Sequence, residues 1–203
     1  MTSHDLRMGE SDPVASSTRA AERSTLVRVG VTAAVACGLL TTVHELWDAS
    51  IPGIQEGAGW ALLHTSWLAA MFLAFLGISA VQRPGLDRFG RICTGVALVA
   101  TGVMTVLAAV ETVSLVGSQP SSGDPALPVL VLILGAFAAY VIGLILFSVA
   151  IIRAGVLPRS AGVVLLAAVL LKMFASDAVP GTLALLGLAV TWVGVAAWRA
   201  AAR

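Results

Sequence analysis

The sequence has little charge, and its acidic and basic residues nearly cancel. Asp, Glu, Lys and Arg make up 11% of the 203 residues, and the formal net charge is +1. Proteins that bind DNA or RNA usually carry a basic surface that attracts phosphates. No nucleic-acid partner is therefore expected.

Motifs that would name a reaction are also missing. The sequence contains no Gly-Lys-Ser/Thr phosphate loop, no Gly-x-Ser-x-Gly nucleophile elbow and no arginine stripe of a voltage sensor. Only two cysteines are present, and Cys37 and Cys93 fall at different membrane depths in the helices predicted below, so no disulfide is expected. The sequence alone does not decide whether the protein is an enzyme.

Long apolar runs are what the sequence does have. Apolar residues make up 58% of the chain and the mean hydropathy is +0.96, both far above the values of soluble domains. The apolar residues gather in runs of about twenty, the length at which an α-helix crosses the hydrocarbon core of a bilayer. They predict an all-α, polytopic bundle of six transmembrane helices over residues 26–47, 60–81, 92–115, 127–152, 161–176 and 182–198.

Arginines predict the orientation of this bundle, because Lys and Arg accumulate in short cytoplasmic loops. With six helices, all of the basic residues that flank the spans fall on one side: Arg19, Arg23, Arg28, Arg83, Arg88, Arg91, Arg153, Arg159, Arg199 and Arg203. The opposite connections carry Asp48, Glu56, Asp124 and Asp177 and no basic residue. Both termini are therefore predicted to be cytoplasmic.

Residues 1–25 are expected to form a disordered cytoplasmic tail, because they are polar and lack periodic apolar residues. Residues 26–203 then form the six-helix transmembrane domain. The stretch Ala34-Val35-Ala36 before Cys37 resembles a signal-peptidase site. The long polar lead and the apolar residues that follow Cys37 favour a first helix that is retained.

Ionisable residues inside the predicted spans indicate a candidate site, because burying such a group is costly unless it is paired or hydrated. His44 and Glu45 lie near the outer end of the first span, and His64 lies about one turn inside the second. Glu111 and Lys172 lie about one turn from the outer ends of the third and fifth spans. At 1.5 Å per residue, all five reach a similar depth. We therefore expect an outward-facing polar pocket.

Helical spacing adds further residues to this pocket. His44 and Asp48 share one face of the first helix, and Trp60, His64 and Trp67 share one face of the second. The predicted substrate-binding residues are Lys172, Glu45, Asp48, Trp60 and Trp67. Structural roles stay open for the same residues: the indoles could form an interfacial belt, Lys172 could extend to the headgroups, and the histidines could bridge two helices.

Three classes of function fit this pattern. In the first, Glu111 is a general acid and His64 or His44 a base that act on a lipid-like, isoprenoid-type substrate. Membrane-embedded terpene cyclases use carboxylic acids in helical bundles in this general way, an analogy at the level of fold only. In the second class, the same residues serve a proton- or cation-linked transporter. In the third, the protein is a structural or regulatory subunit and has no site.

No cofactor or metal is predicted. His44 and His64 at matched depth could ligate haem or zinc, but the third histidine, His4, lies in the tail and no His-Glu-x-x-His motif is present. The expected partners are the lipid bilayer and a lipid-like small molecule. Association of the chain into a homo-oligomer stays open.

The sequence Arg153-Ala154-Gly155-Val156-Leu157-Pro158-Arg159 precedes an apolar helix. It resembles a loop of uncharacterised bacterial multi-helix membrane proteins grouped as domains of unknown function. This resemblance covers the last two or three spans and implies topology rather than an activity. Heavy use of Arg, Ala, Gly and Val with a single Lys indicates a GC-rich bacterial source, which predicts a multi-pass protein of the plasma (inner) membrane.

Overall fold

The computed structural model describes residues 13–50, 57–117, 127–176 and 178–203. These residues form six α-helices, one short 3-10 helix and no strand, so the all-α prediction is confirmed. The elements are α1 (Pro13–Ser50), α2 (Ala58–Gln82), η2 (Arg83–Gly85), α3 (Arg88–Gly117), α4 (Leu127–Ala154), α5 (Arg159–Ala175) and α6 (Thr182–Ala201).

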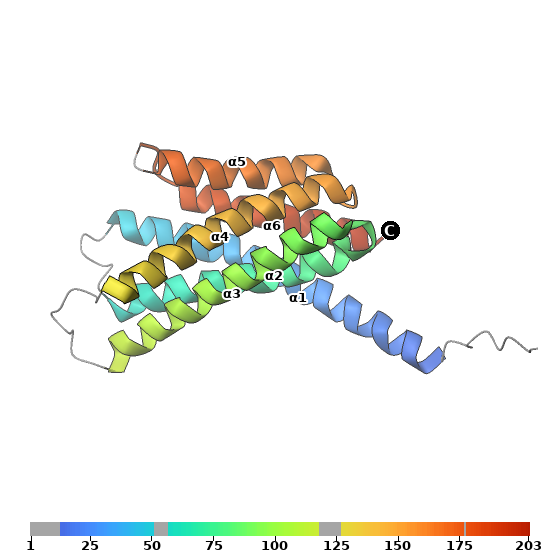
Figure 1. Cartoon of the computed structure of the whole chain (residues 1–203), viewed down its shortest axis with the longest axis horizontal. Helices are drawn as coiled ribbons and strands as arrows, with labels where there is room; N and C mark the ends of the chain where they lie inside the picture. Colours follow the sequence, from blue (N-terminus) through green and yellow to red (C-terminus); the bar gives the residue numbers. More distant parts are fainter. Residues whose placement is uncertain (1–12, 51–56, 118–126, 177) are drawn as a thin grey trace, which may run out of the picture.

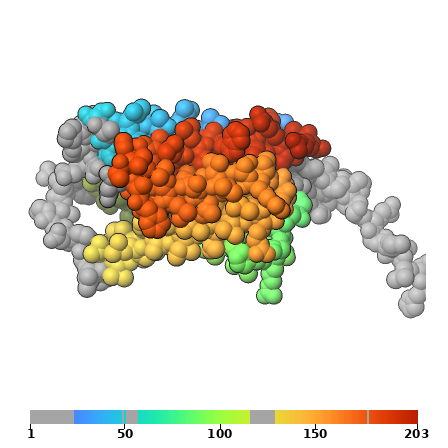
Figure 2. All heavy atoms as spheres, turned by 90° about the horizontal axis from the view of Figure 1, so that it is seen from above, coloured from blue at the N-terminus to red at the C-terminus, as the bar shows by residue number. Residues whose placement is uncertain are grey.

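Five of the six helices, all except α5, contain a stretch long and apolar enough to cross a membrane. α5 has 17 residues. At 1.5 Å per residue it is about 26 Å long, slightly less than a bilayer core. It packs against α4 and α6 and lies over the middle of the face seen in Figure 2. Five helices could therefore span a membrane by length and composition, as a multi-pass membrane protein requires, and α5 is the short member of the bundle.

The N-terminal part of the chain differs from the prediction. α1 begins at Pro13, so residues 13–25, which we expected to be disordered, continue the first transmembrane helix as α-helix. Proline is well tolerated at the first helical position, and the Ala, Glu and Arg residues of this stretch are good helix formers. The first turns of α1 project beyond the bundle (Figure 1). Residues 1–12 lie outside the described part of the chain.

The helices are arranged as a closed ring. Each helix packs against the next one along the chain, and α6 packs against α1, which closes the ring (Figure 1). α2 also contacts α6. Because consecutive helices alternate in direction, the connections α2–α3 and α4–α5 and the C-terminus lie at the same end of the bundle.

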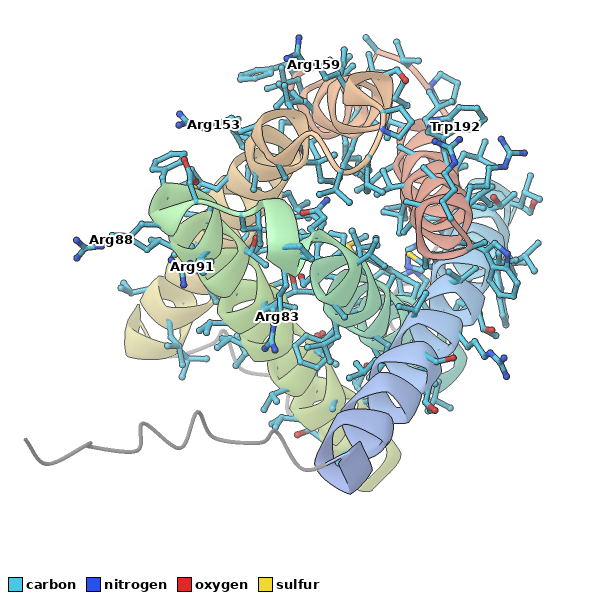
Figure 3. All side chains as sticks on the ribbon, turned by 90° about the vertical axis from the view of Figure 1, so that its right-hand side faces the viewer. Arg83, Arg88, Arg91, Arg153, Arg159 and Trp192 are labelled. Atoms are coloured by element: carbon cyan, nitrogen blue, oxygen red, sulfur yellow. The ribbon has the colours of Figure 1, made fainter. Side chains whose placement is uncertain are left out.

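The arginines of these connections surround that end. Figure 3 looks onto it and shows Arg83, Arg88, Arg91, Arg153 and Arg159 around the helix ends. The gathering of these arginines at one end, expected from the sequence, is thus a feature of the folded chain. Glu56, Asp124 and Asp177, predicted for the opposite connections, lie outside the described residues. That this end faces the cytoplasm stays a prediction.

Asp87 connects two helices at the arginine end. Its Oδ1 accepts a hydrogen bond of 2.6 Å from the backbone N–H of Gly90, which caps the start of α3. Its Oδ2 lies 3.1 Å from a guanidinium nitrogen of Arg153, whose guanidinium lies 5.0 Å from the ring centre of Phe89. The Gly90 hydrogen bond, and secondarily Arg153, hold the pKa of Asp87 below its ordinary value.

Glycines allow α1 to approach both α2 and α6 very closely. A Cβ atom added at Gly30 would overlap the Cα of Gly77 in α2, and one added at Gly38 would lie 3.1 Å from the carbonyl oxygen of Gly187 in α6. Small residues permit such backbone contact between membrane helices, where van der Waals packing replaces the hydrophobic effect as the main attraction. These contacts fix the position of the C-terminal half of α1, which carries the candidate site.

Candidate functional site

A cavity of about 420 Å³ lies inside the helix ring, in the half of the bundle away from the arginines. Its wall includes residues from the end of α1, the start of α2, the end of α5 and the start of α6, together with the middle of α3 and α4. All six helices contribute to it. The lining residues are His44, Asp48, Trp60, His64, Trp67, Leu68, Met104, Phe137, Tyr140, Val141, Leu144, Val169, Lys172, Met173, Ser176, Leu183 and Leu186.

Two histidines from neighbouring helices are in direct contact at the polar side of this cavity. His44 Nε2 of α1 lies 3.4 Å from His64 Nδ1 of α2. A hydrogen bond at this distance requires one ring to donate and the other to accept, so the tautomer of one histidine sets the tautomer of the other. The His44 side chain is only 5% exposed. The predicted proximity of His44 and His64 is therefore present in the structure.

Two tryptophans surround the histidine pair. The Trp60 ring stacks on His64 with centroids 4.9 Å apart and an interplanar angle of 22°, and the Trp67 ring meets His64 edge-on at 5.1 Å. His44 lies 5.0 Å from Trp60 and 6.3 Å from Trp67. The i, i+4 and i, i+7 spacing of these residues on α2 places all three side chains on the face turned towards α1. The four rings form one continuous aromatic cluster, which we call the His–Trp cluster.

Several polar atoms of the His–Trp cluster have no hydrogen-bond partner among the described residues. They are Nδ1 of His44, Nε1 of Trp60 and Nε1 of Trp67. The Trp67 side chain is 5% exposed, comparable to His44. Buried polar groups in folded proteins are nearly always hydrogen-bonded, and exceptions gather where a ligand or water binds. Residues that line the cavity therefore carry three buried polar atoms without a partner among the described residues.

The opposite wall of the cavity is apolar and is formed mainly by α4. Phe137, Val141 and Leu144 line it, together with Tyr140, the single tyrosine of the chain. The Tyr140 hydroxyl donates a hydrogen bond to the Met71 sulfur at 3.2 Å, a weak acceptor. The cavity therefore has one polar side and one apolar side, an arrangement suited to an amphipathic molecule.

Lys172 and Asp48 add one charge of each sign to the cavity wall. Lys172 comes from the last turn of α5 and Asp48 from the end of α1, and both line the cavity. Their substrate-binding role stays a prediction. The lysine is partly buried and Asp48 is exposed. Both lie towards the end of the bundle that is opposite the arginines.

Glu45 lies apart from the cavity and has a different contact. Its two carboxylate oxygens accept hydrogen bonds from the backbone N–H groups of Gly181 at 2.9 Å and Leu183 at 3.0 Å. These groups belong to the start of α6, where Gly181 adopts the left-handed conformation with φ 85°. A carboxylate at a helix N-terminus satisfies free N–H groups and interacts favourably with the helix dipole. In the structure Glu45 therefore links α1 to α6 and does not line the cavity.

Glu111 is also outside the cavity. Its side chain is exposed on the surface of α3, beside Val110 and Val113, which are 58% and 71% exposed. The next residue, Thr112, points inward instead and forms a 2.9 Å hydrogen bond with Thr65 of α2. The expected shared pocket of His44, His64, Glu111 and Lys172 therefore contains three of the four residues. The depth of Glu111 was predicted from the sequence, but not the side of the helix that faces the bundle.

The structure adds residues that sequence analysis did not propose. Tyr140 and Phe137 on α4 and Met173 on α5 line the cavity, yet each sits in a long apolar run with no local pattern that distinguishes it. In the described part of the chain, no group of three His, Cys, Asp or Glu residues is placed to hold a metal ion. The haem and zinc alternatives for His44 and His64 stay untested.

Comparison with protein-family models, with curated proteins and with solved structures finds no match to this chain. The geometry of the cavity is therefore the basis for proposing a function.

Proposed function

We propose that this protein binds a lipid-like molecule in the cavity beside the His–Trp cluster. The observation that carries this proposal is the asymmetry of the cavity wall: unpaired polar atoms of His44, Trp60 and Trp67 on one side, and an apolar surface of α4 on the other. Ligand pockets in proteins are typically ~300–1,000 Å³, mostly apolar, with a few polar groups that orient the ligand. The cavity of about 420 Å³ falls in this range.

The distribution of arginines supports an orientation for this site. If the arginine end lies in the cytoplasm, as the positive-inside rule favours, the cavity belongs to the outer half of the membrane. The protein would then be a plasma-membrane protein of a bacterium whose site takes its ligand from the outer leaflet or the outer aqueous phase. The arginines would meet the anionic lipids of the inner leaflet.

Acid–base chemistry on the bound molecule is a second candidate function, and the contact between His44 and His64 is what favours it. When one ring of a hydrogen-bonded imidazole pair takes up a proton and the other ring releases one, both rings change tautomer. The pair is thus suited to pass a proton to or from a ligand in the cavity. Glu111, exposed on α3, is not positioned to be the acid in this scheme. A proton-linked carrier would use the same pair.

Native mass spectrometry of the purified protein tests the binding proposal. Two neighbouring residues of α4 offer a matched pair: Val141 lines the cavity, whereas Ile142 is 54% exposed on the outer surface. We expect wild type and Ile142→Phe to carry the same co-purified lipid-like mass. Val141→Phe, which fills part of the cavity, should lose it.

Retention of this mass in Val141→Phe would contradict binding in the cavity. Bulk phospholipid alone in all three proteins would contradict a tightly held ligand altogether. Thermal unfolding of each variant in the same detergent checks that the added phenyl ring has not disrupted the fold.

Proton flux into liposomes that contain a pH-sensitive dye tests the second candidate. A proton-linked carrier should acidify the liposomes faster than empty vesicles do, and His44→Gln should remove the difference. Flux equal to that of empty vesicles in the wild type would exclude the carrier and leave binding or chemistry on the ligand.

A further inference from the structure

The unpaired atoms of the His–Trp cluster favour ligands that accept hydrogen bonds. Indole N–H groups only donate hydrogen bonds, and so does the Lys172 ammonium. Trp60 and Trp67 both line the cavity with Nε1 unpaired among the described residues, and Trp67 is 5% exposed. Donors in an apolar site gain most from a partner that accepts, because a buried donor without an acceptor has lost its hydrogen bonds to water. A ligand with acceptor atoms is therefore favoured over one with donors only.

The tautomers of the histidine pair decide whether His44 Nδ1 donates a hydrogen bond to the ligand or accepts one from it. If His64 donates to His44 in the 3.4 Å contact, Nδ1 of His44 carries a hydrogen and donates; if His44 donates, its Nδ1 accepts. A carbonyl oxygen fits the first arrangement, and a hydroxyl group fits either of them. The Tyr140 hydroxyl, which uses its hydrogen on the weakly accepting Met71 sulfur, can turn to a stronger carbonyl acceptor.

The charges of the wall do not favour an ionic ligand. Asp48 and Lys172 are the charged residues that line the cavity, and their charges are opposite. Their charges cancel, so the wall carries no net charge that would select a permanent cation or a free anion. A head group without net charge matches this wall.

The shape of the wall favours a flat ring. Six ring-bearing side chains line the cavity, four from the His–Trp cluster and two, Phe137 and Tyr140, from α4. Rings stack offset or meet edge to face at centroid separations of about 4.5–7 Å, so such walls select planar groups. The remaining lining residues are mainly Leu, Val and Met, which suit an alkyl or prenyl chain.

We infer that the ligand of this cavity carries a neutral, planar head group with carbonyl acceptors, of the quinone type, on an apolar chain. This inference rests on the proposed binding function and specifies its ligand class. The head group accepts hydrogen bonds from Trp67 Nε1, from Trp60 Nε1 and from His44 Nδ1 in its donating tautomer, while its chain lies along the α4 wall.

Isothermal titration of the detergent-purified protein with four probes that share a decyl chain tests the head group directly. The probes are decylubiquinone, decylbenzene, decanoate and decyltrimethylammonium, each corrected with a blank titration into empty micelles. Decylubiquinone should bind at least about tenfold more tightly than each of the others. Tighter binding of decanoate or decyltrimethylammonium, or equal binding of all four, would overturn the inference but leave a lipid-binding cavity. Binding of none would overturn the proposed function as well.

Substitutions of the tryptophans test whether an indole N–H donates the hydrogen bond to the head group. Trp67→Phe keeps an aromatic ring but removes the N–H, so decylubiquinone affinity should fall about tenfold while decylbenzene affinity stays nearly unchanged. Trp192→Phe is the matched control, because Trp192 is 51% exposed on α6 and points away from the helix ring (Figure 3). If Trp67→Phe lowers the unfolding temperature, Trp60→Phe provides the same test at a less buried position. Equal affinities in wild type and both cavity variants would overturn the assignment.

Discussion

The middle of α1, which holds Gly30 and Gly38, and its C-terminal end, which holds His44, make opposite contacts with neighbouring helices. At Gly30 and Gly38 the helix touches the backbones of α2 and α6, and there is no room for a methyl group between them. Towards its other end, at His44, imidazole and indole rings lie between α1 and α2, and a cavity opens next to them. Side-chain size thus sets the helix separation: the tightly packed middle of α1 holds the bundle together, and its open C-terminal end is available for a ligand.

The largest effect should come from the tightly packed middle of α1. In Gly30→Ala the new methyl group overlaps Gly77, so the helices must move apart, and we expect a loss of about 1–3 kcal/mol in the free energy of unfolding. Gly95→Ala on α3 is the control, because an added Cβ there meets nothing within 4 Å. The control should be neutral or slightly stabilising. Equal effects in SDS-induced unfolding of the two variants would contradict the close α1–α2 contact.

A smaller effect is expected from Glu45, which fixes the C-terminal end of α1 to α6. Glu45→Gln removes the negative charge and one of the two acceptors that cap α6, and should cost about 1–2 kcal/mol. Glu111→Gln, a carboxylate at similar depth on an exposed surface, should change unfolding by less than about 0.5 kcal/mol. The same unfolding titration compares both. A larger loss in Glu111→Gln would reverse the assignment of the two residues.

His44→Leu tests ligand binding independently of the stability of the helix bundle. The substitution breaks the contact with His64 but also removes a buried polar atom without a partner, so stability should stay within about 1 kcal/mol of wild type. Ligand binding should nevertheless be lost, as measured by the co-purified mass. A strongly destabilised His44→Leu that still binds would show that the histidine pair is a structural link between two helices.

The smallest effect should appear at the arginine end and only in acid. Because hydrogen bonding to Gly90 and the nearby Arg153 lower the pKa of Asp87 in the folded protein, this carboxylate stabilises the fold above its ordinary pKa of 3.8. That contribution disappears as the pH falls through the lower, folded value. Asp87→Asn should therefore show a weaker decline of the unfolding temperature between about pH 5 and 3 than wild type does. Parallel curves for the two proteins would contradict this.

The lengths of the apolar runs were sufficient to place the helices. The predicted spans fall inside the six observed α-helices, apart from Ser176 at the end of α5, because a membrane requires runs of apolar residues whose length is set by the bilayer. The exception lies at the start, where α1 reaches back to Pro13. The span-length apolar part of α1 begins at Ser24. Polarity alone does not indicate disorder, because a polar stretch rich in Ala, Glu and Arg can also continue a helix.

For the candidate site, the sequence predicted a membrane depth for each residue but not which side of its helix faces the bundle. The sequence by itself predicted that His44, His64, Lys172, Glu45 and Glu111 lie at one level, because residues rise by about 1.5 Å along every helix. Tertiary structure alone decided which of them face each other. One residue turns a helix by about 100°, so Thr112 contacts α2 while Glu111 is exposed, and Glu45 caps α6 while His44 lines the cavity. Depth is a property of each helix alone, whereas direction depends on how the six helices pack.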